Sequence, residues 1–573
     1  MSGLKALIIG GVAGGASAAA RLRRLDETAD ILILERSGFI SYANCGLPYF
    51  VGGDIQEQRA LTLQTPQSFW NRFRIEARVR NEAIAIDRAR KTVTVRRLDD
   101  GTEYEERYDK LILSPGAKAV RPPLPGIGSE RVVTLRTVED AVALRDRLRD
   151  APPQSAVVVG GGYVGLEMAE NLMGMGVETT VVEQQGQLLS PLDYDMACEV
   201  HAYLQDKGLS LLLGRSVAGF EDQPDGVRVQ LESGETLDAG LVVLAIGVQP
   251  DTQLARDAGL TLGVRGAIVV DDRLRTSDPD IYAVGDAVEV RHLITGEQTL
   301  IPLAGPANKQ GRIAADNLCG RDSRYRGSQG SSILKLFDLT VAATGLNARA
   351  ARAAGLACEE VVTFSASHAT YYPGATNMTV KTLFDPDSGR LLGAQIVGFD
   401  GVDKRIDVLA TALRAGLTAA DLAELELAYA PPFSSAKDPV NMAGFVMENV
   451  RGGLVRQYHW YEVDSLPRDG SVTLLDTRTE REYAGGHIDG TVHIPLDSLR
   501  DRLGELDPAK PVYVNCHSGL RSYIACRILT QHGFTCCNLS GGYRFYALIR
   551  NDCGFDATPA HPCGLRLGEE AGA

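Results

Sequence analysis

The chain has 573 residues, and its 59 lysines and arginines against 73 aspartates and glutamates give a formal net charge of −14. This length exceeds what one hydrophobic core supports, so several domains are expected. The acidic balance argues against a nucleic-acid partner, and no stretch approaches the roughly 18 uninterrupted apolar residues of a membrane span.

The cysteines and the N-terminus predict a cytoplasmic protein. Ten cysteines in a chain of this size do not form a disulfide scaffold, and without export their thiols stay reduced. The first apolar run, in MSGLKALIIGGVAGG, is too short for a signal peptide and is interrupted by glycines. Any disulfide in this chain is therefore expected to be catalytic.

Residues 5–35 read as an apolar strand, a glycine-rich turn, an amphipathic helix and a second apolar strand ending in a glutamate. This order predicts a βαβ unit with a parallel sheet. Val12 stands where the dinucleotide fingerprint has its middle glycine. The cofactor-binding residues expected in this unit are Gly10, Val12, Gly15, Glu35 and Arg36. The alternative is a Rossmann-like unit that packs without a ligand.

A single cysteine follows in the stretch SYANCGLPYF, residues 41–50. Cys45 has no second cysteine nearby, since the next one is Cys198. A redox-active Cys45 would need a sulfur from outside the protein and would cycle between a thiolate and a mixed disulfide. A predicted helix start at this position would stabilise the thiolate. The alternative is a buried structural cysteine.

The strand–turn–helix–strand pattern returns at residues 155–183 with the complete dinucleotide fingerprint. Gly160, Gly162 and Gly165 form the turn, and Glu183 closes the second strand. The glycines let a pyrophosphate approach the backbone at a helix N-terminus, while the acid accepts ribose hydroxyls and repels a 2′-phosphate. The unit therefore favours NADH, with NADPH as the alternative.

Later segments complete this organisation. In TSDPDIYAVGDAVEV, Gly285 and Asp286 lie on a turn at a strand end, where the carboxylate suits a hydroxyl of a flavin ribityl chain. Residues 325–448 combine strand-like runs with a helical stretch, and 449–463 read as a linker. A new unit begins after it, at VTLLDTRTEREYAGGHIDGTVHIPL.

Taken in this order, the motifs of residues 1–448 resemble the pyridine nucleotide–disulfide oxidoreductase family. The resemblance implies an α/β fold with two Rossmann-like domains of the glutathione-reductase type, and an α+β dimerisation domain. The implied boundaries are FAD-binding 1–116 and 248–324, NAD(P)H-binding 117–247, and dimerisation 325–448.

The stretch around the lone Cys45 resembles that of the single-cysteine, coenzyme A-disulfide-reductase branch of the family. Val12 also has parallels in that branch. The resemblance implies that Tyr163 covers the flavin and moves aside for the nicotinamide. It also implies a face that contacts coenzyme A, formed by Ser17, Arg21, Arg24, Ser41, Asn44, Asn308 and Lys437. A solvated basic helix face is the alternative for Arg21.

The resemblance further implies a homodimer in which Tyr371 and Tyr429 reach the flavin and thiol of the opposite subunit. A tyrosine can donate its proton to a nascent thiolate in a site of low dielectric constant. Two core tyrosines are the alternative.

Residues 464–560 resemble a rhodanese domain of α/β type, through DTR (476–478), GHIDGTVHIP (486–495) and NCHSGLRSY (515–523). The six-residue loop from Cys516 to Arg521 can turn its N–H groups inward, which favours an anion or a persulfide on Cys516. A tail, 561–573, follows. No metal site is expected, because the other cysteines lack CxxC spacing; those of this region are Cys526, Cys536, Cys537, Cys553 and Cys563.

The sequence thus predicts an FAD-dependent, NADH-driven reductase of coenzyme A disulfide, coenzyme A persulfide or polysulfide. The rhodanese domain, on a flexible tether, would handle sulfane sulfur. One alternative is an NADH oxidase or peroxidase that works through a cysteine sulfenic acid. Another is a sulfur-carrier or redox-sensing module.

Overall fold

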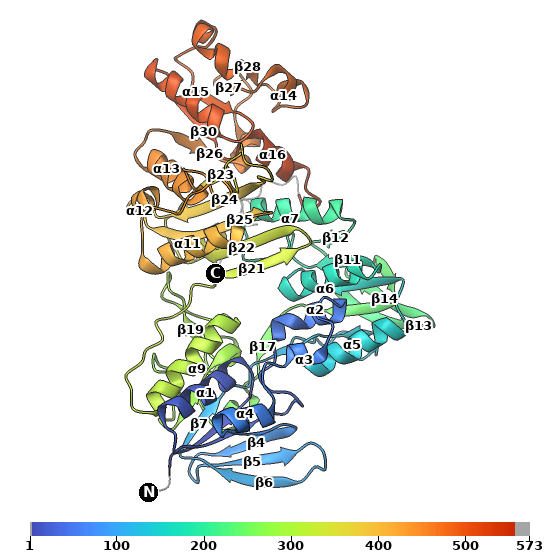
Figure 1. The fold of residues 1–573 in the computed structure, drawn as a ribbon. Coiled ribbons are helices and arrows are strands. Elements are labelled where there is room, and N and C mark those ends of the chain that lie inside the picture. The colour runs from blue at the N-terminus through green and yellow to red at the C-terminus, as the bar shows by residue number, and fades with distance from the viewer. Residues whose placement is uncertain (1–2, 556–573) are drawn as a thin grey trace. The chain divides into compact units, whose positions relative to one another are not determined.

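The computed structural model describes residues 3–555, which form two compact units (Figure 1). Of the described residues, the first unit contains 3–182 and 215–330, and the second contains 183–214 and 331–555. No helix in the described part of the chain is long and apolar enough to cross a membrane.

The first sheet of the first unit is parallel and five-stranded. Strand β1 (Lys5–Ile9) lies at its centre between β2 (Asp30–Leu34) and β7 (Lys110–Leu113). Strand β18 (Ile281–Ala283) extends the sheet beyond β7, and β3 (Glu76–Arg78) extends it beyond β2. Segments far apart in sequence thereby meet at the end of β1 where the glycine turn begins.

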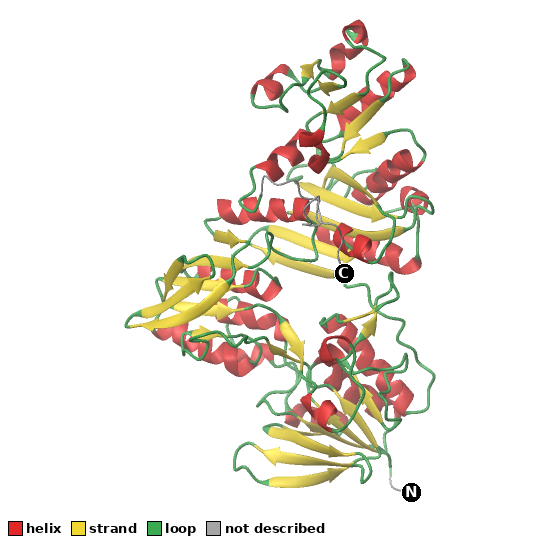
Figure 2. Cartoon of the chain, turned by 180° about the vertical axis from the view of Figure 1, so that it is seen from behind, coloured by secondary structure: helices red, strands yellow, loops and turns green. Residues whose placement is uncertain are grey.

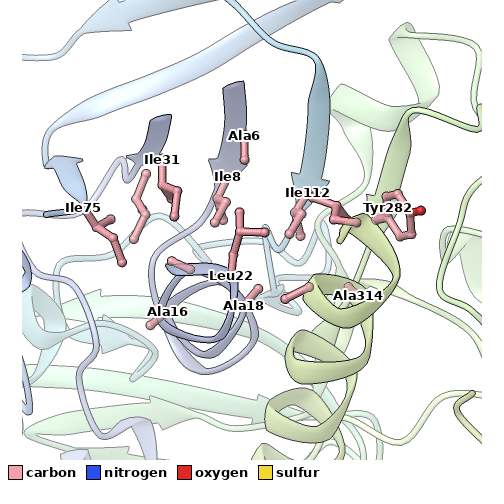
Figure 3. Close-up of a cluster of buried hydrophobic side chains, with 14 of the residues drawn as sticks. Ala6, Ile8, Ala16, Ala18, Leu22, Ile31, Ile75, Ile112, Tyr282 and Ala314 are labelled. Carbon is pink, nitrogen blue, oxygen red and sulfur yellow. The ribbon is translucent and has the colours of Figure 1, made fainter. Parts of the chain in front are cut away.

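Helix α1 (Ala13–Leu25) packs against this sheet beside α9 (Ala304–Leu318). Leu22 of α1 is fully buried and points toward the strands (Figure 3). The two helices approach closely because Gly311 has no side chain, and a Cβ there would lie 2.2 Å from the carbonyl oxygen of Gly14. The small residues of α1 therefore allow the close packing of the two helices in addition to forming the glycine turn.

The second sheet repeats this plan. Strand β10 (Ser155–Val159) pairs in parallel with β11 (Glu178–Glu183) and with β16 (Leu241–Leu244), which pairs with β9 (Val132–Val133). Helix α6 (Tyr163–Gly174) follows the glycine turn after β10. Both βαβ units predicted from the glycine patterns are present.

The first unit also contains two three-stranded antiparallel sheets (Figure 2). Their strands are β4 (Asn81–Asp87), β5 (Thr92–Arg97), β6 (Glu103–Arg107), β13 (Val217–Gln223), β14 (Gly226–Leu231) and β15 (Thr236–Ala239). The remaining helices are α2 (Leu47–Gly52), α3 (Gln58–Leu61), α4 (Pro66–Phe73), α5 (Val138–Asp150) and α8 (Gln253–Asp257).

The second unit contains an antiparallel five-stranded sheet. In spatial order its strands are β21 (Ser332–Leu336), β22 (Leu339–Gly345), β25 (Leu391–Gly398), β24 (Asn377–Phe384) and β23 (Glu359–Ala366). Strands β24 and β25 are almost wholly buried. The helices around the sheet are α7 (Tyr194–Asp206), α10 (Ala348–Ala353), α11 (Val402–Ala415), α12 (Ala419–Glu424) and α13 (Pro439–Arg451).

A parallel sheet forms the C-terminal part of the second unit. In spatial order its strands are β26 (Arg456–Tyr458), β30 (Cys536–Leu539), β29 (Val512–Asn515), β27 (Thr473–Asp476) and β28 (Val492–His493). Its helices are α14 (Glu480–Ala484), α15 (Leu520–Gln531) and α16 (Gly542–Arg550). This α/β arrangement and the two Rossmann-like sheets are the fold class that the sequence predicts.

The segment 449–463, predicted to be a linker, is folded in the structure. It contains the end of α13, the edge strand β26 and the start of a 3-10 helix, Trp460–Ser465. Tyr458 and Trp460 are both buried. The apolar side chains of this segment bind it to the C-terminal sheet, so it does not form the flexible tether expected from its glycines and charges.

Candidate active sites

The first glycine turn can accept no larger side chain at two positions. Gly10 has φ +93°, and a Cβ on it would lie 2.0 Å from the carbonyl oxygen of Ser114. A Cβ on Gly15 would lie 1.9 Å from the oxygen of Gly10. Val12 directly precedes α1. The turn thus keeps the tight approach of helix and strand that a bound pyrophosphate needs.

Glu35 lies buried beside this turn. Its carboxylate accepts the N–H of Gly11 at 2.8 Å and the N–H of Ser37 at 2.9 Å. Burial raises the pKa of the Glu35 carboxyl, and these two hydrogen bonds oppose that rise. A carboxylate fixed in this way retains lone pairs for ribose hydroxyls, which fits the adenosine part of FAD.

Two further residues expected at the flavin are held by ion pairs. The Asp286 carboxylate accepts a hydrogen bond of 2.7 Å from Arg136 and follows Gly285, whose φ is +83°. Arg36 donates to Asp251 at 2.6 Å. Gln310 was not anticipated from the sequence, and its side-chain oxygen accepts the Gly285 N–H at 2.7 Å.

The second glycine turn keeps open space where a ligand would approach. Gly160 and Gly165 leave no room for a side chain, since a Cβ on either would lie 2.4 Å or less from a backbone oxygen. A Cβ on Gly162 would meet no atom within 4 Å, and Tyr163 then begins α6. Glu183 ends β11, and its carboxylate accepts the N–H of Gln185 at 2.8 Å.

Cys45 is an exposed, free thiol. It lies in a 3-10 turn, Asn44–Gly46, directly before the six-residue helix α2. Partial burial of the sulfur raises the pKa of the Cys45 thiol, the carboxylate of Glu167 raises it further, and Arg136 opposes the shift. The helix-start stabilisation of the thiolate predicted from the sequence is therefore outweighed by the burial of the sulfur and by the nearby carboxylate.

The backbone around Cys45 is strained and joined to the first glycine turn. Ser41 has φ +47°, a conformation that costs a non-glycine residue on the order of 1–3 kcal/mol. Its N–H donates to the carbonyl oxygen of Gly11 at 2.8 Å. The side-chain oxygen of Asn44 is buried with no hydrogen-bond partner among the described residues. An orphaned acceptor beside an exposed thiol is typical of a ligand site.

The predicted coenzyme A face on α1 carries less free charge than its sequence suggests. The Arg21 guanidinium donates to Asp316 at 2.7 Å, and Arg24 is exposed. The buried Arg23 donates to backbone carbonyls. Ser17 donates to the side-chain oxygen of Asn308. Arg24 is thus the guanidinium of this face that solvent reaches.

Tyr371 and Tyr429, both in the second unit, are a hydrogen-bonded pair with 2.6 Å between their hydroxyl oxygens. They are 74% and 47% exposed, which rules out the alternative of two core tyrosines. Either hydroxyl can donate in this pair, and the hydrogen bond to Tyr429 raises the pKa of Tyr371. Lys437, expected to contact coenzyme A, is exposed in the same unit.

A buried arginine holds the two loops that carry these tyrosines. Arg405 is 1% exposed and donates to the carbonyl oxygen of Ser367 at 2.8 Å and to Asp438 at 3.0 Å. The N–H of Ala369 donates to the Ser434 carbonyl at 3.0 Å. Sequence reasoning missed Arg405, because an arginine on a helix with an apolar face resembles an ordinary solvated residue.

Cys516 follows strand β29 and is fully buried under its own loop. Its sulfur accepts hydrogen bonds from the N–H of Gly519 at 3.1 Å and from the hydroxyl of Ser522 at 3.2 Å. The N–H of Tyr543, on α16, donates to the Cys516 carbonyl at 2.7 Å. The loop thus presents donors to the sulfur, as the sequence predicts for a persulfide-carrying cysteine.

Arg521, the last residue of this loop, is held by a residue that the sequence did not single out. Glu482 accepts two hydrogen bonds from its guanidinium, at 2.7 and 2.6 Å. These bonds, above all, hold the pKa of the Glu482 carboxyl well below its usual range. Glu482 lies 39 positions before Arg521, so only the fold brings them together.

One group of described side chains, Cys198, His201 and Asp552, has metal-ligand geometry, with its ligand atoms within 4.8 Å of one another. The His201 ring is already engaged at both nitrogens. Nε2 accepts the N–H of Leu188 at 3.0 Å, so Nδ1 carries the proton toward Asp552 at 2.9 Å. Because both ring nitrogens of the neutral His201 are hydrogen-bonded, we interpret this group as a structural contact. Cys563 lies outside the described residues.

Comparisons with known proteins identify the family of each part of the chain. Residues 4–311 match the model of the pyridine nucleotide-disulphide oxidoreductase family, 331–439 match its dimerisation domain, and 460–547 match a rhodanese-like domain. The coenzyme A disulfide reductase of Staphylococcus aureus (strain JH9) is 34% identical over 442 residues, 77% of this chain and 99% of the relative.

Two solved structures resemble nearly the whole chain. The reduced CoADR-RHD protein of Bacillus anthracis is 45% identical with a TM-score of 0.94, and the match covers 96% of this chain and 99% of that one. The NAD-dependent persulfide reductase from A. fulgidus is 39% identical with a TM-score of 0.88, covering 95% and 100%.

Proposed function

The chain belongs to the pyridine nucleotide–disulphide oxidoreductase family, and from this premise we propose that it is an FAD-dependent, NADH-driven reductase of sulfur compounds. Its substrates are coenzyme A disulfide and persulfides of coenzyme A or related thiols, and its fused rhodanese-like domain handles sulfane sulfur. The coenzyme A disulfide reductase and persulfide reductase relatives support this substrate class.

The observation that carries the proposal is the place of Cys45. This thiol is exposed and free, and its segment is hydrogen-bonded through Ser41 to the glycine turn of the FAD-binding fold. Among the described residues no cysteine forms a disulfide with it. A thiol at this place is suited to exchange with a sulfur that a ligand brings.

The chain's own residues would hold two nucleotides. Gly10, Gly15 and Glu35 fit the adenosine and pyrophosphate of FAD, and Asp286 fits its ribityl chain. Glu183 would accept the ribose hydroxyls of NADH and repel the extra phosphate of NADPH. When bound, FAD accepts a hydride from the nicotinamide and supplies the electron pair that reduces a disulfide.

The sulfur chemistry at Cys45 balances in two steps. The Cys45 thiolate attacks R–S–S–R, forms Cys45–S–S–R and releases RS⁻ with the electron pair of the broken bond. Two electrons then cleave Cys45–S–S–R into the Cys45 thiolate and a second RS⁻. With R–S–SH, attack at the outer sulfur releases RS⁻, and the reduction yields HS⁻.

The released thiolates need protons, and the tyrosine pair of the partner subunit is suited to supply them. Tyr371 donates its hydroxyl hydrogen to Tyr429 and leaves the Tyr429 hydroxyl to donate to RS⁻. The Tyr371 hydrogen bond would then stabilise the phenolate formed at Tyr429. The dimerisation domain supports a homodimer as the assembly in which this contact forms.

Anaerobic NADH consumption by the holoprotein tests the proposal, with coenzyme A disulfide, coenzyme A persulfide, glutathione persulfide and polysulfide as acceptors. We expect turnover with at least one of them and loss of it in Cys45→Ser. An NADH oxidase would instead turn over fastest with oxygen. A sulfur carrier would consume no NADH with any of these acceptors, although it would transfer sulfur in the wild type and in Cys45→Ser alike. Either result would contradict the proposed reductase.

A further inference from the structure

Two of the three guanidiniums around the Cys516 loop are hydrogen-bonded to a carboxylate. Arg521 donates twice to Glu482, and Arg478 donates to Asp476 at 2.6 Å. The third guanidinium is that of Arg544, whose backbone N–H donates to the loop at His517. Its carboxylate neighbour is Glu199, with 3.9 Å between the charged atoms.

The loop histidine adds no compensating positive charge. Burial lowers the pKa of His517, the three guanidiniums lower it further, and Glu482 alone opposes them. His517 is therefore neutral at pH 7. Arg521 and Arg478 are each hydrogen-bonded to a carboxylate and the imidazole is neutral, so the guanidinium at the end of the Cys516 loop carries no uncompensated charge.

Two apolar side chains are exposed at the rim of the loop, beside the exposed His517. Leu520, at the start of α15, is 60% exposed, and Ile524 follows it one turn later at 38%. Inside the loop, the Cys516 sulfur is held by a backbone N–H and by the Ser522 hydroxyl. The loop thus stabilises the reacting sulfur through hydrogen bonds, and its terminal Arg521 offers no uncompensated charge to a small dianion.

We propose that Glu482 is a specificity-determining residue of the Cys516 site, because by neutralising Arg521 it selects organic persulfides over inorganic thiosulfate as sulfur donors. The inference rests on the sulfane-sulfur role proposed above for this domain. Thiosulfate carries two negative charges and depends on uncompensated cations for its approach. An organic persulfide presents a terminal sulfur with at most one charge and an apolar arm that suits Leu520.

The transfer that this site selects balances without a further reactant. The Cys516 thiolate attacks the terminal sulfur of R–S–SH, its bond to the inner sulfur breaks, and RS⁻ leaves with the electron pair. The product is Cys516–S–SH, and the thiolate RS⁻ takes a proton from water. The corresponding reaction with thiosulfate would release sulfite.

Glu482→Gln in the full-length holoprotein tests the inference. Glutamine at this position keeps the hydrogen-bonded start of α14, because its side-chain oxygen can still accept the N–H of Thr479. The variant leaves the Arg521 charge uncompensated. Glu480→Gln, an exposed position in the same helix, is the matched control. Thiosulfate and glutathione persulfide serve as donors, cyanide as acceptor, and thiocyanate formation gives kcat/KM for each donor.

For thiosulfate we expect kcat/KM to rise roughly tenfold in Glu482→Gln, which is the size of the attraction between one uncompensated positive charge and a dianion. The gain should shrink at high salt, while kcat/KM for glutathione persulfide stays within about twofold. Equal changes for both donors, or none, would overturn the inference while leaving sulfur transfer itself in place.

Intact-mass analysis in a Cys45→Ser background separates this failure from that of the proposed function. Wild-type Cys516 should gain the mass of one sulfur atom from glutathione persulfide, and Cys516→Ser should not. If no sulfur appears on Cys516 from either donor in any variant, the proposed sulfane-sulfur role is wrong, and the inference that rests on it is wrong as well.

Discussion

At the scale of single residues, the reactivity of Cys45 is set by the groups that surround its thiol. Burial raises its pKa, and Glu167 adds to the rise. Burial also raises the pKa of the Glu167 carboxyl to about 7, while the hydroxyl of Tyr49 donates to it at 3.4 Å. The Glu167 carboxyl therefore becomes negatively charged as the pH rises through neutrality, and this charge disfavours the Cys45 thiolate.

Glu167→Gln should lower the pKa of Cys45, because it removes a carboxylate that opposes the thiolate. Iodoacetamide alkylation of Cys45, followed as a function of pH in the holoprotein, should shift its midpoint to lower pH. Alkylation near pH 7 should accelerate a few-fold. Glu178→Gln, at the exposed start of β11, is the control. An unchanged or higher midpoint in Glu167→Gln would contradict the role given to the Glu167 carboxylate.

A second prediction at the scale of single residues concerns the pair formed by Tyr371 and Tyr429. Tyr429→Phe should lower turnover about 100-fold, the usual contribution of a general acid. Tyr371→Phe should lower it roughly tenfold, because it removes only the hydrogen bond that stabilises the phenolate. Tyr372→Phe, next in the chain and 44% exposed, is the control. Stopped-flow reduction of the flavin by NADH should be unaffected, whereas equal losses in all three variants would refute the assignment.

At the scale of elements, a buried ionic cluster fixes α7 to the sheet of the second unit. Lys381 is fully buried, and its ammonium lies 3.1 Å from Asp193, 2.7 Å from Asp195 and 2.8 Å from Glu360. Burial raises the pKa of Asp195 to about 7, although Lys381 opposes the rise. These carboxylates come from the start of α7 and from β23, so a single ammonium joins both elements to β24.

Lys381→Met should destabilise the second unit by about 3–5 kcal/mol, because it leaves buried carboxylates without their cation. Those carboxyls would then hold protons in the folded state that the unfolded chain releases, so the loss should grow as pH rises. Urea denaturation at several pH values measures this. Lys335→Met, at an exposed position of β21, is the control. Equal midpoints for the two variants would contradict the role given to Lys381.

The sequence predicted elements far better than it predicted the partners of charged residues. The glycine spacing of both βαβ units reflects steric closure at Gly10, Gly15, Gly160 and Gly165, which is a local property. The partners of Arg21, Arg405 and Arg521 were not predictable, because they lie 295, 33 and 39 residues away and are brought close only by the fold.

At the scale of the whole molecule, the second unit joins the rhodanese-like domain to the dimerisation sheet through buried contacts. Phe545 of α16 lies edge-on to Phe364 of β23, with 6.1 Å between the ring centroids. Asp552 accepts from Tyr194 at 2.8 Å and pairs with the buried His201. The sequence suggested a tether instead, because aromatic contacts between distant segments leave no periodic signal.

The central claim is that the redox partner of Cys45 is a sulfur carried by a ligand. Intact-mass analysis of the oxidised holoprotein in a Cys516→Ser background tests it most directly. After incubation with coenzyme A disulfide, we expect one coenzyme A per chain on Cys45, released when NADH is added without oxygen and absent from Cys45→Ser. A disulfide between Cys45 and another cysteine of the chain, or an oxygen adduct as the only NADH-reducible form, would contradict the account.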